Sequence, residues 1–256
     1  MDPATLIGIV LATVSLLIMM IMEGSSPMAI VLLPAMILVF GGTFGAAIAG
    51  SSMSDVKKIG AWFKQALLPA KVPPVSDRIA TLVSLAEKAR KEGLLALEAQ
   101  VKQIDDPFLK RGLQMGIDGT DPEELRAVLE GEIAAKKAED KVGAKFFTAM
   151  GGYAPTVGII GTVVGLIHVL ENLDKPESLG PLIAGAFVAT LWGVLSANIF
   201  WLPMGAKITR ISDLQAAQME LLVEGITEIQ AGTSPRAVRQ KLNALVPPSE
   251  VQQDAA

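Results

Sequence analysis

The chain has 256 residues, of which 51% are hydrophobic, a formal net charge of −4 and no cysteine. Its mean hydropathy of +0.46 is too high for an ordinary soluble domain and indicates several membrane spans. The lack of cysteine excludes disulfides, thiolate catalysis and cysteine-ligated metals. A single histidine argues against a histidine zinc site within the chain, and the acidic balance gives no indication of nucleic-acid binding.

Four apolar windows are long enough to cross a bilayer, because each holds about 20 residues and the hydrocarbon core is about 30 Å thick. The first two, Ala4–Met22 and Met28–Ala49, are separated by a short polar turn, and the N-terminus lacks the basic region of a cleavable signal peptide. After a long polar stretch come Met150–Leu170 and Leu182–Met204. We therefore predict four transmembrane helices in two hairpins.

The basic residues predict the orientation of these spans. Of 22 Lys and Arg residues, 16 lie between Ser51 and Ala149, five follow Met204, and one is Lys175 in the second hairpin. Cytoplasmic loops carry an excess of Lys and Arg. The long middle segment and both termini are therefore expected in the cytoplasm.

The middle segment has helical periodicity. Apolar residues recur at helical spacing over Ile79–Arg90, with Ser76 or Asp77 as the expected N-cap. Asp121 followed by Pro122 is a second start signal, and the pattern continues from there into the third span. No strand pattern competes with these helices.

The predicted fold is therefore all-α, a polytopic membrane protein with four transmembrane helices and a helical cytoplasmic domain. We expect four regions along the chain. They are a transmembrane hairpin at 1–50, a cytoplasmic helical domain at 51–149, transmembrane helices 3 and 4 at 150–204, and a cytoplasmic C-terminal helix and tail at 205–256.

None of the four windows contains Asp, Glu, Lys or Arg. Ionisable side chains inside a bilayer are expensive and usually mark ion pathways, so this chain alone is a poor candidate for an ion pump. Hydroxyl and amide side chains remain, and their residue types favour bonding to the backbone or between helices. They are Thr43, Thr156, Thr162, Thr190, Ser196 and Asn198.

Small residues form smooth ridges along the third and fourth spans. Such ridges let helix backbones approach closely, either within one chain or between copies. The ridge residues are Gly161 and Gly165 in the third span, and Gly185, Ala189, Gly193 and Ala197 in the fourth. Pro155 and Pro203 fall at the same, cytoplasmic, depth, where they either end helices or form a hinge.

The order of these features resembles the MotA/PomA family of flagellar stator subunits, in the MotA/TolQ/ExbB superfamily. The fourth span is similar to the family signature at AFVATLWGVL, Ala186–Leu195, and at the following Pro203. The third span is similar at APTVGIIGTVVGL, Ala154–Leu166. The loop stretch ARKEGLLALE, Ala89–Glu98, resembles the rotor-facing motif of the family.

The resemblance implies a non-enzymatic ion-channel subunit in the bacterial cytoplasmic membrane, with no cofactor besides the transported H⁺ or Na⁺. The ion-binding aspartate would come from motility protein B, around which five copies of this chain assemble. The small-residue ridges would then face neighbouring subunits and the partner helix. Thr162 and Thr190 match positions that line the ion path beside that aspartate.

The resemblance also assigns roles at the cytoplasmic side. Pro155 and Pro203 match paired prolines that couple ion passage to conformational change. Arg90 and Glu98 match charged residues that engage the rotor protein of the switch ring. Ion selectivity stays open, because Thr162 and Thr190 are typical of sodium-type members whereas Ala189 is not.

Three other functions are compatible with parts of the sequence. An energising subunit of the ExbB/TolQ type would have three spans, which the first hairpin argues against. A self-sufficient transporter would need a charged or substrate-binding midplane, which the sequence does not show. A structural membrane scaffold predicts that replacing Thr162 and Thr190 with valine leaves ion flux unchanged.

Overall fold

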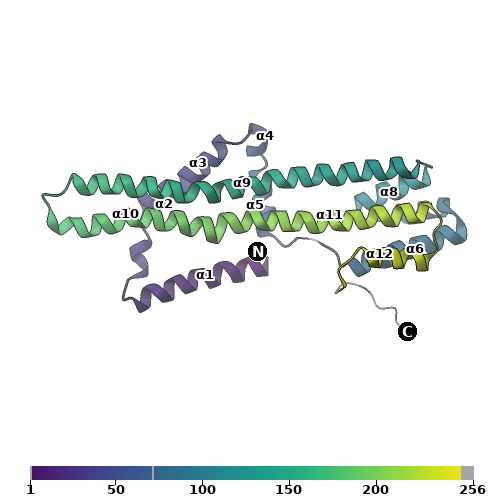
Figure 1. Ribbon diagram of the computed structural model, residues 1–256, viewed down its shortest axis with the longest axis horizontal. Helices are drawn as coiled ribbons and strands as arrows, with labels where there is room; N and C mark the ends of the chain where they lie inside the picture. The colour runs from purple at the N-terminus through teal and green to yellow at the C-terminus, as the bar shows by residue number, and fades with distance from the viewer. Residues whose placement is uncertain (1, 71, 249–256) are drawn as a thin grey trace. The chain divides into compact units, whose positions relative to one another are not determined.

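The computed structural model describes residues 2–70 and 72–248, and these residues form helices without any strand (Figure 1). The all-α prediction is confirmed. The chain divides into two compact units. Unit 1 comprises Met1–Ala70 and Asp140–Arg210, and unit 2 comprises Lys71–Glu139 and Ile211–Ala256.

Unit 1 begins with the apolar helix α1, Pro3–Met22. The Asp2 side chain caps it by accepting a hydrogen bond from the Thr5 amide at 3.3 Å, and Pro3 occupies the first helical position. Only 6% of its most apolar window is buried, so nearly the whole helix surface is available to lipid.

The second apolar window is helical over a shorter range than predicted. A 3₁₀ turn, η1 (Pro27–Ile30), comes first, and the continuous helix begins only at Leu33. That helix consists of α2 (Leu33–Met36), a π-helical segment η2 (Ile37–Gly41) and α3 (Gly42–Ala49). It is about 26 Å long at 1.5 Å per residue, the lower limit for a span.

Pro34 explains the late start of this helix. A helix continuing from Met28 would press the Pro34 ring against the carbonyl of Ile30, four residues earlier. The Ile30 carbonyl instead accepts a hydrogen bond from the Trp192 indole at 2.7 Å. A distant side chain therefore satisfies the backbone group that the break exposes.

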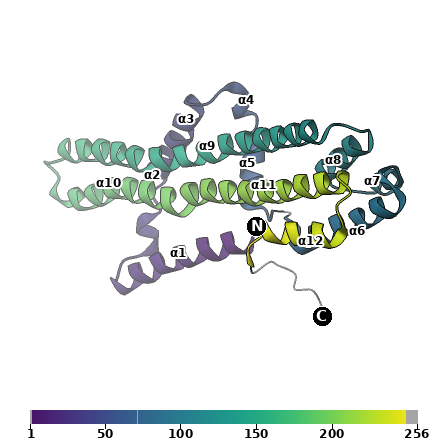
Figure 2. The same cartoon turned by 45° about the vertical axis from the view of Figure 1, so that its right-hand side comes forward.

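Two long helical runs contain the third and fourth predicted spans. Helix α9, Pro122–Leu170, is continuous into the third predicted span, as expected from the sequence. Helix α10 (Pro176–Ser196), the π-helical segment η4 (Ala197–Trp201) and α11 (Leu202–Gln230) form the other run. Within unit 1, α9 and α10 lie side by side (Figures 1 and 2). Among the described residues, α1 and these two runs are long and apolar enough to cross a membrane, and Leu33–Ala49 is a shorter apolar helix.

In unit 1, aromatic side chains pack α5 against the part of α9 that precedes the third span. Two short helices lead there, α4 (Met53–Val56) and α5 (Ile59–Leu67). Trp62 of α5 lies 5.5 Å from Phe146 of α9 between ring centroids, and its indole fills the space where a side chain at position 143 would project. Gly143 is therefore required for this packing, since a Cβ would lie 2.7 Å from the Trp62 Cδ1 atom.

Unit 2 is a helical bundle with its own apolar core. It contains the start of α9, the end of α11 and five further helical segments. These are α6 (Val75–Glu92), η3 (Leu94–Leu97), α7 (Glu98–Val101), α8 (Pro107–Ile117) and α12 (Pro235–Ala244). The predicted Asp121 cap is confirmed, because its carboxylate accepts the Glu123 amide at 2.9 Å.

The predicted start of α6 is wrong. Neither Ser76 nor Asp77 caps the helix, which begins at Val75 after Pro74 and has no side-chain cap. Val75 packs against the core of unit 2, so burial of this side chain extends the helix beyond the polar residues.

Candidate functional site

Two threonines of the adjacent apolar helices meet in unit 1. Thr162 of α9 and Thr190 of α10 have their hydroxyl oxygens 2.5 Å apart. The Thr162 hydroxyl also lies 3.0 Å from the carbonyl oxygen of Ala186, and the Thr190 hydroxyl lies 3.3 Å from that of Gly158. Both side chains are half-buried. The structure therefore brings together two hydroxyl and two carbonyl oxygens from different helices.

This oxygen cluster can interact with a cation or a water molecule. Each hydroxyl has one proton to donate and two lone pairs to accept with, so two hydroxyls in contact cannot use all their lone pairs on each other. The carbonyl oxygens each have a second lone pair as well. Rings of such neutral oxygens replace part of the hydration shell of an ion in membrane proteins.

Glycines make the close approach of α9 and α10 possible. A Cβ at Gly158 would lie 2.8 Å from the carbonyl oxygen of Ala189, and a Cβ at Gly193 would lie 2.6 Å from that of Ala154. Gly158 is not among the residues predicted from the sequence, although it lies four residues before Thr162 in the small-residue series Ala154–Gly158–Thr162. That spacing is the signal that could have identified it.

The predicted small-residue ridges pack largely within the chain. A Cβ at Gly161 would lie 2.6 Å from the Ala189 Cβ, and one at Gly165 would lie 2.7 Å from the Ala186 Cβ. Gly185 differs, because its nearest neighbour is the Leu32 side chain at 3.3 Å. Ala197 is 1% exposed and begins the π-helical segment η4. These small residues therefore set the distance between neighbouring helices of one chain.

The two predicted proline sites are joined by packing between their neighbours. Pro155 lies inside the continuous helix α9, and its missing amide leaves the Gly151 carbonyl, four residues earlier, without its helical donor. Leu202, which precedes Pro203, packs directly over Gly151 and leaves no space for a Cβ there. Pro203 itself lies two residues after the π-helical segment η4, and helices often kink at prolines and at such widened turns.

Charged residues in unit 1 lie outside the apolar windows. At the start of α1, the Asp2 carboxylate forms an ion pair with Lys207 at 2.9 Å. A hydrogen bond from the Lys207 ammonium lowers the pKa of Asp2 below its ordinary value. Over the residues that the structure describes, no three His, Cys, Asp or Glu side chains gather into a metal site.

The two predicted rotor-facing residues lie on different segments of unit 2. Arg90 is exposed in the last turn of α6, and Gly93, with a φ of +85°, ends that helix. Glu98 is the first residue of α7, where it forms an exposed ion pair with Lys102 at 2.9 Å. Arg90 lines a cavity of about 1020 Å³ between α6 and α12, and Glu98 does not.

Comparison with known proteins agrees with this arrangement. Residues 100–221 match the MotA/TolQ/ExbB proton channel family, and residues 6–93 match the motility protein A N-terminal family. Motility protein A of Bacillus subtilis is 36% identical over 247 residues, which cover 96% of this chain and 92% of that protein. The chain belongs to the motility protein A family. Membership in a proton channel family means that the chain is a channel component and not an enzyme.

Solved structures of motility protein A complexes share the fold. The MotAB structure from C. jejuni superposes with a TM-score of 0.94 at 30% identity. The flagellar MotAB stator complex from Bacillus subtilis superposes with a TM-score of 0.92 at 35% identity. Each comparison covers 99% of this chain and 100% of the other chain. The match over residues 6–93 also includes the first hairpin, which argues for motility protein A over an ExbB/TolQ-type subunit.

Proposed function

We propose that the chain is the ion-channel subunit of a flagellar motor stator and converts ion flow across the cytoplasmic membrane into torque on the rotor. The observation that carries this proposal is the contact of Thr162 with Thr190 in a membrane unit whose apolar windows contain no Asp, Glu, Lys or Arg. Such a unit offers a polar path but no carboxylate within the windows, and its one histidine, His168, is exposed beside Glu171 near the end of α9. We infer that a second chain supplies the ion-binding carboxylate.

The second chain in this proposal is motility protein B, whose single membrane helix carries the ion-binding aspartate. Five copies of this chain surround two copies of that partner, with both termini of this chain in the cytoplasm. The oxygens around Thr162 and Thr190 then line the path beside the aspartate and exchange hydration water with the passing ion. The similarity to MotAB complexes supports this assembly.

The two prolines couple ion passage to movement. Pro155 and Pro203 lower the number of backbone hydrogen bonds at neighbouring points of the two helical runs, which makes bending there less costly. Contact between Leu202 and Gly151 links the two points. Each ion that binds or leaves the partner's aspartate then shifts this pair and rotates or steps the ring around its partner.

The rotor contact is assigned to Arg90 and Glu98 in unit 2. Exposed charges guide encounter and set register more than they add affinity, which suits a contact that forms and breaks with every step. The resemblance of Ala89–Glu98 to the rotor-facing motif supports this assignment.

A complementation experiment tests the proposal. The gene is deleted in its own bacterium, and swimming is measured after complementation with the wild type, with Pro155→Ala or with Arg90→Glu. We expect the deletion to abolish swimming, the wild type to restore it, and both variants to fail. Pro181→Ala is the control, because Pro181 lies inside α10, far from the Pro203 end of the span.

The scaffold alternative and the transported ion are tested by ion flux. Under the proposal, Thr162→Val and Thr190→Val each reduce flux through the complex with the B subunit, whereas a scaffold would leave it unchanged.

Swimming speed measured with a sodium gradient and with a protonophore identifies the ion. Loss of motility on adding the protonophore at constant sodium indicates H⁺, and loss on removing sodium indicates Na⁺.

A further inference from the structure

A basic concave surface of unit 2 is formed by two helices that are far apart in the sequence. Helices α6 and α12 lie side by side (Figures 1 and 2) and enclose the cavity of about 1020 Å³. Arg90 and Lys91 of α6 and Arg236 and Arg239 of α12 contribute four cations to its lining. The one carboxylate in the lining, Glu87, forms an ion pair with Lys91 at 2.6 Å. Arg90 and Arg236 therefore give the surface an excess of positive charge.

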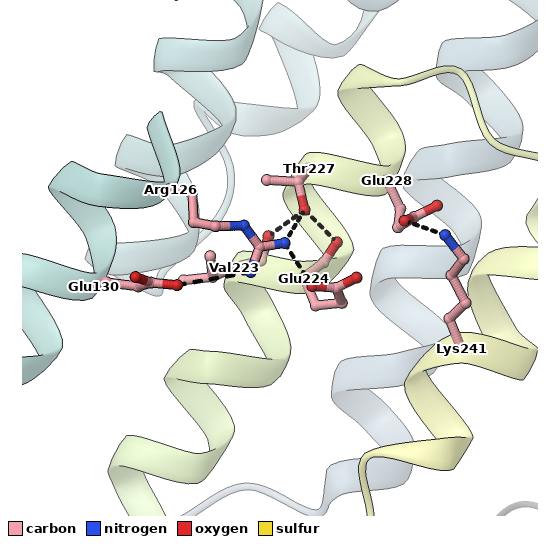
Figure 3. A network of polar contacts seen from close by, with 7 residues as sticks. All are labelled: Arg126, Glu130, Val223, Glu224, Thr227, Glu228 and Lys241. Atoms are coloured by element: carbon pink, nitrogen blue, oxygen red, sulfur yellow. Dashed lines mark hydrogen bonds and ion pairs between the residues drawn. The ribbon is translucent and has the colours of Figure 1, made fainter. Parts of the chain in front are cut away.

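Helix α12, which carries Arg236 and Arg239, is packed firmly against the rest of unit 2. Ser234 caps the helix, and Val238 and Leu242 are fully buried in the core of unit 2. On its outer side, the Lys241 ammonium donates to the Glu228 carboxylate of α11 at 2.5 Å (Figure 3). This helix is therefore part of the bundle and not a loose tail.

A second group of polar contacts in unit 2 lies near the Glu228–Lys241 pair (Figure 3). Arg126 of α9 forms an ion pair with Glu224 of α11 at 2.6 Å and a hydrogen bond with Thr227 at 3.3 Å. This group ties α9 to α11 in the same region where Lys241 ties α12 to α11. These contacts set α9 and α12 relative to α11 within unit 2.

Two arginines of the cavity lining are available to a partner. Arg90 and Arg236 are exposed, and neither makes an ion pair or hydrogen bond within the described part of the chain. A guanidinium group binds a carboxylate through two parallel hydrogen bonds. Two such groups on neighbouring helices can receive carboxylates spaced along one face of a third helix.

The exposure of the charged lining residues favours a protein partner over a small anion. A site built for a small anion places polar side chains deep inside a closed pocket. Here none of the charged lining residues is buried. An open, charged surface of this kind is typical of contacts that form quickly and separate again.

We propose that α12 is part of the rotor-docking surface, with Arg236 acting together with Arg90 to receive an acidic helix face of the rotor protein. This inference rests on the proposed function and extends it, because it adds a second helix, from the other end of the sequence, to the contact. Charge reversal at Arg236 should then impair the rotor contact much as reversal at Arg90 does.

Binding of the rotor protein to the full-length complex tests this directly. The chain is purified with its B subunit in lipid nanodiscs, and association of the switch-ring protein from the same bacterium is measured at low and high salt. We expect Arg236→Glu to slow association about tenfold or more at low salt, with a smaller effect at high salt. Lys88→Glu is the control, because it makes the same charge change on α6 outside the cavity lining.

Each outcome separates the inference from the proposed function. Loss of binding in Arg236→Glu and Arg90→Glu but not in Lys88→Glu supports the inference, and replacing an acidic residue of the rotor helix by lysine should then restore binding. Wild-type binding in Arg236→Glu together with loss in Arg90→Glu overturns the role of α12 and leaves the proposed function in place. Equal loss in Lys88→Glu also overturns it, because the effect is then one of net charge. Absence of any binding by the wild-type complex counts against the rotor assignment itself.

Discussion

The contact between Thr162 and Thr190 shows how two ordinary side chains acquire a specific role through their neighbours. A threonine in a membrane helix usually satisfies its hydroxyl on its own backbone, and Thr162 does lie 3.3 Å from the Gly158 carbonyl oxygen. The missing side chain at Gly158 brings the second helix close enough for Thr190 to join the same cluster. Helix packing and polar lining are therefore two results of one arrangement.

Replacing Thr190 by valine should reduce ion flux and leave the fold intact, because valine keeps the shape and removes the hydroxyl. A hydrogen bond contributes about 0.5–1.5 kcal/mol, and raising the barrier to ion passage by that amount lowers the flux by about two- to tenfold. Flux through proteoliposomes that contain the chain and its B subunit measures the effect. Thr156→Val is the control, since the Thr156 hydroxyl is exposed and bonds only to the Tyr153 carbonyl of its own helix. Equal flux in both variants would contradict the role of the threonine pair.

Gly193→Ala should destabilise unit 1. The new Cβ would lie 2.6 Å from the Ala154 carbonyl oxygen and 3.1 Å from the Gly158 Cα, and backbone atoms cannot rotate away. Overpacking of this kind costs about 1–3 kcal/mol. Thermal unfolding in detergent should show a lower midpoint.

Gly152→Ala is the matched control for this change. Gly152 lies in the helical run α9, and a Cβ added there would meet no heavy atom within 4 Å, so alanine should be neutral or raise the midpoint. A midpoint for Gly193→Ala at or above the wild type would show that the two helices do not pack as closely as described.

At the scale of elements, the second and fourth spans are irregular helices. Pro34 delays the start of the second span, and Pro203 follows a π-helical segment. The second span also contains a π-helical segment, and Phe40 in it packs against Trp192 at 5.7 Å and Trp201 at 6.3 Å between ring centroids. Such segments are widened turns, and they often mark functional positions in helices.

Pro203→Ala should stiffen the helix and uncouple ion flow from motion. Alanine restores an amide that can donate to the carbonyl of Ile199, four residues earlier. We expect slower hydrogen exchange over residues 197–203 and loss of swimming, with ion flux retained. Pro181→Ala at the other end of the span should preserve swimming. Unchanged exchange and full swimming in Pro203→Ala would exclude a hinge at this position.

The attachment of α12 should weaken in acid. Burial raises the pKa of Glu228, but hydrogen bonds from Lys241 and Thr233, together with the charges of Lys241 and Arg126, lower it below its ordinary value. A carboxyl with a lowered folded-state pKa stabilises the fold fully above its unfolded-state pKa, about 4.3, and loses this contribution as the pH falls through the folded-state pKa.

Hydrogen-exchange protection factors of α12 measure this effect. Protection should be constant from neutral pH down to about pH 5 and should fall below about pH 4. Lys241→Met should lower protection at neutral pH and reduce the further loss in acid. A wild-type protein with unchanged protection across this range would show that the Glu228–Lys241 pair does not hold α12.

For the whole molecule, the sequence predicted features that depend on local composition. The apolar windows, the helical class and the Asp121 cap follow from hydropathy and side-chain type near each position. Other features depend on partners far along the chain. The break before Leu33 involves Trp192, the need for glycine at position 158 arises from α10, and the basic cavity requires α6 and α12 to be neighbours. No periodicity within one segment reveals such pairings.

The central claim is that this chain is only part of a channel and that its ion-binding carboxylate comes from another chain. The most direct test is ion flux in proteoliposomes that contain the purified chain alone, the chain with its B subunit, or the chain with a B subunit whose membrane aspartate is replaced by asparagine. We expect flux only for the chain with the unaltered B subunit. Flux through the chain alone, or through the complex with the asparagine variant, would contradict it.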